Sequence, residues 1–159
     1  MIFVLLVAAG AIFVWWSSGG LPDVVASHFN AGGAADGFMP RGQYTAFMLA
    51  LMVLVPLLLR LAGGLAGRLP VQFVNLPNKQ YWLAPERKAA TLASIASFGG
   101  WASYATLALL CAVHGFVARA NSVQPPRLDE APLIGLVAVY LVVLFAGMLA
   151  VLGRFFRSP

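Results

Sequence analysis

Polar side chains that could do chemistry gather in one stretch of an otherwise apolar sequence. The segment from residue 17 to residue 43 contains His28, Asn30 and Asp36, and a second histidine, His114, lies near the end of a later apolar run. Imidazole and carboxylate groups are ligands that Zn²⁺ and other divalent ions accept. The sequence therefore offers His28, Asp36 and His114 as a candidate divalent-metal site, and it suggests no other cofactor.

A structural role is the alternative for the same side chains. Asn and Asp commonly hydrogen-bond the backbone of tight turns, so His28, Asn30 and Asp36 can instead hydrogen-bond the backbone of a tight loop, in which Gly32-Gly33 and Asp36-Gly37 are turn dipeptides. His114 can equally be a packed histidine of the core. The metal-binding spacings H-E-x-x-H and C-x-x-C are absent, as are a nucleophile elbow and a phosphate-binding glycine loop. These absences do not favour an enzyme, and both interpretations of the histidines stay open.

The composition shows what kind of solvent the chain needs. Hydrophobic residues make up 61% of the sequence and charged residues only 9%, whereas a soluble domain carries about 25% charged residues. Such a chain is suited to a lipid bilayer rather than to water. The net charge of +5 comes without a basic stripe or a recognition module, so we do not expect nucleic-acid binding.

Four apolar segments are long enough, or nearly long enough, to cross a bilayer, which takes about 20 helical residues. They lie at residues 2–18, 44–66, 85–117 and 131–153. The first has no basic residues before it, so we interpret it as a retained span rather than a cleaved signal peptide. The sequence thus predicts one all-α membrane domain over residues 1–159, a bundle of four transmembrane helices with an ordered outer loop.

Basic residues predict the orientation of these spans. With four spans, both termini and the second loop share one side. The basic residues of that side are Arg68, Lys79, Arg87, Lys88, Arg154 and Arg157, with Arg60 at a helix end. The other side holds Arg41, Arg119 and Arg127. The positive-inside rule then predicts a multi-pass membrane protein with both termini in the cytoplasm.

Two loops carry long sequence motifs. The outer loop contains LPDVVASHFNAGGAADGF and the inner loop contains NLPNKQYWLAPER. Both resemble patterns of a bacterial membrane domain of unknown function, which also forms the N-terminal part of SdpI-type proteins. The outer positions that carry the resemblance are Leu21, Pro22, His28, Phe29, Asn30, Gly33, Asp36 and Gly37. The inner positions are Asn75, Pro77, Asn78, Lys79, Tyr81, Trp82, Pro85, Glu86 and Arg87.

SdpI-type proteins resemble immunity proteins against a secreted peptide toxin, so the resemblance implies binding, sensing or immunity at the extracytoplasmic face. The partners expected are the lipid bilayer and either a peptide ligand or another membrane protein. Two alternatives stay open: a non-catalytic accessory subunit of a membrane complex, and a metal-dependent enzyme or transporter. The spacing of Gly63 and Gly67 is typical of close helix contacts, within the chain or in an oligomer.

Overall fold

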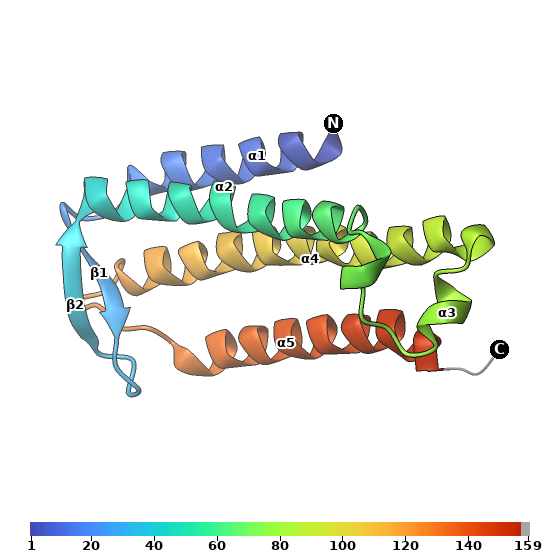
Figure 1. Cartoon of the computed structure of the whole chain (residues 1–159). Coiled ribbons are helices and arrows are strands. Elements are labelled where there is room, and N and C mark those ends of the chain that lie inside the picture. Colours follow the sequence, from blue (N-terminus) through green and yellow to red (C-terminus); the bar gives the residue numbers. More distant parts are fainter. Residues whose placement is uncertain (157–159) are drawn as a thin grey trace.

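The structure is a computed structural model that describes residues 1–156, and it contains four long helices that run side by side (Figure 1). They are α1 (Ile2–Ser18), α2 (Arg41–Ala66), α4 (Pro85–Ala120) and α5 (Glu130–Gly153). Each begins and ends within three residues of the predicted span. Pro85 occupies the first turn of α4, with Glu86 beside it. Proline suits this position because it has no backbone N–H, and the N–H groups of a first helical turn have no partner within the helix.

Helix length and composition make this a multi-pass membrane protein in contact with the bilayer. Within the described residues, three helices are long and apolar enough to cross a membrane: α2, α4, and α5 together with its extension to Phe156. Helix α1 is apolar but shorter, at 17 residues. Large side chains on α1 such as Val4 and Ile12 are nevertheless about two-thirds exposed, which suits a helix that faces lipid.

The prediction of an all-α fold with an outer loop is wrong for residues 24–40. This segment forms an antiparallel hairpin of two strands, β1 (Val24–Phe29) and β2 (Ala35–Pro40), in which Val25 pairs with Met39 and His28 with Gly37. The Asn-Ala-Gly-Gly turn between the strands reverses the chain. The hairpin lies across one end of the bundle, which we call the hairpin end (Figure 1).

Three short helices occupy the opposite end, which we call the α3 end. They are η1 (Val71–Phe73), α3 (Lys79–Trp82) and η2 (Arg154–Phe156). The N-terminus lies at the same end (Figure 1). The structure therefore groups the N-terminus, the loop that follows α2 and the end of α5, as the basic-residue argument required. Arg157, which was assigned to this side, lies outside the described residues.

Helix α4 is the central helix of the bundle. Met52 of α2, Val14 of α1 and Leu107 of α4 share one buried cluster. Helices α2 and α4 approach most closely at Gly63 and Gly99, where a Cβ added to Gly63 would lie 2.9 Å from the Gly99 Cα. The predicted glycine contact is thus confirmed, with Gly99 as a partner that the spacing did not identify.

Helix α5 is attached more loosely. None of its residues is buried, and it contacts α4 rather than α1 or α2. Gly147 gives room to the indole of Trp101, and the hydroxyls of Tyr140 and Thr106 are 2.7 Å apart. The rest of the α5 surface is apolar and open, which is the surface expected of a helix in lipid.

Candidate functional site

A buried side chain at the end of α4, Asn121, attaches the hairpin to the bundle. Its Oδ1 accepts a hydrogen bond from the Ala26 N–H at 2.8 Å, and its Nδ2 donates to the Ala26 carbonyl at 2.9 Å. Nδ2 also donates to the Val117 carbonyl. An amide side chain can make this pattern because it carries both a donor and an acceptor. The hairpin therefore has a defined position on the helices.

The turn of the hairpin is fixed by Asn30 and Gly33. The Asn30 Oδ1 accepts hydrogen bonds from the N–H groups of Gly32 and Ala34. Gly33 has φ +72°, a left-handed conformation that favours glycine. Its carbonyl accepts a hydrogen bond from the Leu128 N–H at 2.9 Å, and a Cβ at this position would collide with the Leu128 carbonyl. These residues shape the loop and attach it to the segment before α5.

His28 and Asp36 face each other across the two strands. Nδ1 of His28 and Oδ1 of Asp36 are 2.5 Å apart, and the two side chains are 74% and 42% exposed. Gly37 makes this possible, because a Cβ there would lie only 2.8 Å from the His28 Cβ. The sequence placed both residues at one site, and the structure brings them together. Within residues 1–156 the other ring nitrogen of His28 forms no hydrogen bond, so it is open to a ligand.

The structural interpretation holds for some residues of the outer motif and not for others. Asn30 does hydrogen-bond the backbone of a tight turn, as the structural interpretation predicted. Gly33 and Gly37 provide space, and Leu21 lies in the core with an exposed fraction of 5%. Phe29 is half-buried beside them. His28 and Asp36 differ from these residues, since their side chains bond to one another and extend into solvent.

His114 lies apart from this pair. It is completely buried between α1, α2 and α4. Its Nε2 is 2.7 Å from the Ser17 Oγ, and its Nδ1 is 2.9 Å from the Tyr44 hydroxyl. The Tyr44 ring stacks on the imidazole, and Phe13 meets it edge to face. Both ring nitrogens are thus satisfied inside the protein, which is the usual condition of a buried polar side chain.

The predicted grouping of His28, Asp36 and His114 is not formed. Across residues 1–156, no three His, Cys, Asp or Glu side chains come close enough together to hold a metal ion. His114 bonds Ser17 and Tyr44 inside the bundle, and the hairpin offers only the two ligands of the His28–Asp36 pair. A divalent metal therefore does not enter the function we propose.

The inner-loop motif forms the α3 end. Asn78 adopts a left-handed φ of 51°, and its Nδ2 donates to the Phe155 carbonyl. The Trp82 indole N–H donates to the same carbonyl at 3.2 Å, and its ring meets Phe155 edge to face. The Arg87 guanidinium lies 3.9 Å from the centre of the Tyr81 ring. This motif joins the segment before α4 to the segment after α5.

The remaining inner-loop residues are less engaged. Lys79 donates to the Gln72 carbonyl from an exposed position. Asn75, Pro85 and Glu86 are exposed, and Pro77 is half-buried. Lys79 lines a cleft of about 320 Å³ together with Asn78, Gln80 and Tyr81, and no function is assigned to it.

Sequence reasoning missed several residues that hold the two ends. Asn121 follows a predicted helix, where Asn is common, but only the fold brings it to Ala26. Tyr44 and Ser17 lie near predicted helix ends, and nothing in their spacing connects them with His114. Phe155 is fully buried, although the sequence placed it just beyond the last predicted span.

The fold and site define a multi-pass membrane protein with a small hairpin across one end of its helices. Residues 2–54, about a third of the chain, match the model of a family described as a domain of unknown function (DUF1648). The match covers α1, the hairpin and the first half of α2, so the resemblance carried by the outer motif is confirmed for this part. No curated protein and no solved structure matches the chain.

Proposed function

We propose that this chain is a bacterial inner-membrane protein that binds an extracytoplasmic partner through the His28–Asp36 pair. The observation that supports it is the contrast within the hairpin. Its glycines, Asn30 and Leu21 are engaged in turn geometry or packing, whereas His28 and Asp36 form a 2.5 Å pair on the surface. A paired imidazole and carboxylate present a donor and an acceptor at fixed positions, which suits recognition of a polar ligand.

The same proposal includes four spans with both termini in the cytoplasm. Large apolar side chains are exposed along α1, which supports the insertion of this helix in the bilayer as the first span. At the α3 end, Arg68, Lys79, Arg87, Lys88 and Arg154 outnumber Arg41, Arg119 and Arg127 at the hairpin end. By the positive-inside rule this distribution favours a cytoplasmic α3 end and an extracytoplasmic hairpin.

A partner of the kind suggested by the SdpI resemblance is a secreted peptide, and the role would then be sensing or immunity. The hairpin suits such a ligand because its exposed pair sits on strands anchored through Asn121. An accessory subunit is the alternative, in which the partner is another membrane protein. The open face of α5 does not favour that alternative, since lipid covers an apolar helix equally well.

Sidedness is tested first, by cysteine labelling in intact cells. Ala31→Cys places a thiol on the exposed turn, and Cys111→Ala removes the native cysteine. A membrane-impermeant maleimide should label position 31 from outside, whereas Gln72→Cys at the α3 end should react only after permeabilisation. Labelling of position 31 from the cytoplasm alone would overturn the proposal.

Binding is tested with a photo-crosslinking residue in place of Phe38, which is exposed on β2 two residues after Asp36. The adduct formed in cells should disappear with His28→Ala or Asp36→Ala and persist with Gln43→Ala, an exposed change at the same end. A peptide in the adduct supports sensing or immunity, and a membrane protein supports an accessory subunit. An unchanged adduct in both pair variants would contradict the proposal.

A further inference from the structure

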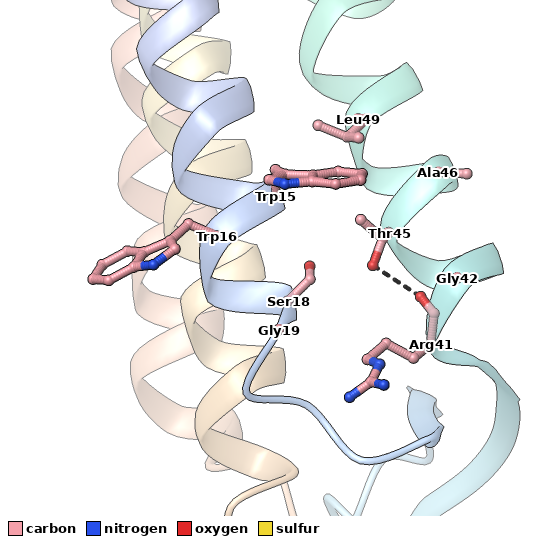
Figure 2. Close-up of a pocket in the computed structure, with 9 residues that line it drawn as sticks. All are labelled: Trp15, Trp16, Ser18, Gly19, Arg41, Gly42, Thr45, Ala46 and Leu49. Atoms are coloured by element: carbon pink, nitrogen blue, oxygen red, sulfur yellow. Dashed lines mark hydrogen bonds between the residues drawn. The ribbon is translucent and has the colours of Figure 1, made fainter.

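A cleft of about 480 Å³ lies between α1 and α2 near the hairpin end (Figure 2). This volume is within the range of roughly 300–1,000 Å³ typical of small-molecule sites. The residues on which the argument depends are Trp15, Ser18, Arg41, Thr45, Ala46 and Leu49. None of them belongs to the His28–Asp36 pair, so the inference below is independent of the proposed function.

One buried hydroxyl in this cleft has no partner. Ser18 is 3% exposed, and its Oγ is buried without a hydrogen bond to any residue in the 1–156 segment. Figure 2 shows it pointing into the space between the two helices. The neighbouring Thr45 hydroxyl is already used, because it donates to the Arg41 carbonyl. Buried polar groups are nearly always satisfied, so the Ser18 hydroxyl indicates a ligand that completes the site.

Arg41 lines the same cleft, and Asp23, which does not line it, is paired with Arg41. The Arg41 Nη1 donates to the Leu21 carbonyl at 2.8 Å, and its Nη2 is 3.0 Å from Oδ1 of Asp23. A guanidinium has five N–H donors in a planar fork that matches phosphate, so Arg41 retains donors for a ligand. The Asp23 side chain is 92% exposed. The cleft therefore contains one cation, and the anion paired with it lies next to the cleft in an exposed position.

The apolar part of the cleft continues along α2. Ala46 and Leu49 line it further along α2 than Arg41, and the Trp15 ring extends toward Leu49 (Figure 2). Trp15 and Trp16 are 69% and 81% exposed. Exposed tryptophans near a helix end mark the level of lipid headgroups. The polar and apolar parts of the cleft thus follow the direction from headgroup to acyl chain.

We propose that the cleft binds one phospholipid with a zwitterionic ethanolamine headgroup. The phosphate lies at Arg41, the primary ammonium at Asp23, and an ester or glycerol oxygen accepts a hydrogen bond from Ser18. One acyl chain runs between Trp15 and Leu49. A zwitterion satisfies both members of the Arg41–Asp23 pair. An anionic lipid brings no cationic group to Asp23, and a choline headgroup has no N–H to donate to it.

The test is native mass spectrometry of the purified full chain in detergent, titrated with ethanolamine, glycerol and choline phospholipids of identical chains. One ethanolamine lipid should be retained at a concentration at least tenfold lower than the other two. Inorganic phosphate is titrated separately, and displacement of the lipid by phosphate alone would overturn the acyl-chain part of the site. Equal retention of all three lipids would overturn the headgroup assignment.

Two matched pairs of variants place the lipid. Leu49→Trp enlarges a side chain that points into the apolar part (Figure 2) and should lower retention at least tenfold, whereas Ala50→Trp, at the next position and exposed, should not. Arg41→Gln should lower retention similarly, and Arg119→Gln at the same end should not. Asp23→Asn should remove the preference for ethanolamine over glycerol. Unchanged binding by Leu49→Trp would show that the lipid lies elsewhere.

Discussion

At the hairpin end, the side chains of His28 and Asp36 bond to each other in solvent, whereas at the α3 end Asn78 and Trp82 both donate to the carbonyl of Phe155. Both ends carry a long motif, and both are ordered by contacts between distant segments. The difference lies in where the polar groups are used. At the α3 end they join the chain to itself, and at the hairpin end one pair remains available. The motif at the α3 end therefore serves the fold, whereas the motif at the hairpin end leaves one exposed pair, which we propose binds a partner.

The buried residues between these ends follow a third pattern. His114 bonds Ser17 and Tyr44 and so connects α4 with α1 and α2. Nearby, the hydroxyl of Ser18, on the same helix as Ser17, has no hydrogen-bond partner among residues 1–156. One polar group is thus satisfied by neighbouring helices, and the other faces the cleft. This contrast separates helix association from the proposed lipid site.

The largest loss of stability should come from removing the Phe155 side chain, which packs at the α3 end. Phe155→Ala deletes a fully buried ring, and such deletions typically cost about 3–5 kcal/mol. Thermal unfolding in detergent should show a large fall in the midpoint, and hydrogen exchange should increase around α3 but not in the hairpin. Phe156→Ala, which changes a ring that is 70% exposed, is the control. Equal effects of the two variants would contradict the anchoring role.

A smaller loss of stability should follow from breaking the hydrogen bonds between the hairpin and α4. Asn121→Ala leaves the buried N–H and carbonyl of Ala26 without their partners, at a cost of about 1–3 kcal/mol. Hydrogen exchange at Ala26 should accelerate while α3 stays protected. Ser122→Ala, which changes the exposed neighbouring residue, should leave exchange at Ala26 unchanged. If exchange rose equally at both ends, the two ends would not be separate units.

The smallest effect on stability should come from the exposed pair itself. Surface substitutions usually change stability by less than about 0.5 kcal/mol, and exposed ion pairs contribute little because water and salt screen them. The double variant His28→Ala, Asp36→Ala should therefore unfold at nearly the same temperature as the natural chain while losing its crosslinked partner. A marked loss of stability would mean that the pair, like Asn78 and Trp82, serves the fold.

Much of the fold followed from local sequence. Apolar length defined all four helices to within three residues, because a bilayer requires a long apolar helix to satisfy its own backbone. Pro85 and Glu86 indicated where α4 begins. The hairpin was missed because its short strands mix apolar and polar residues between glycines, and this composition is also typical of an ordered loop. Its pairing depends on Val25 and Met39 meeting at a distance along the chain.

The candidate site was only partly predictable for a similar reason. His28 and Asp36 were recognised together because they lie eight residues apart in one motif, and a hairpin brings such residues face to face. His114 was grouped with them by its side of the membrane alone, and the helix packing directs it inward to Tyr44. Residue type and spacing determined that this chain crosses a bilayer and carries a polar motif beside it. Only the tertiary structure decided which polar groups are buried and which stay exposed, because burial depends on contacts between segments that the chain order does not specify.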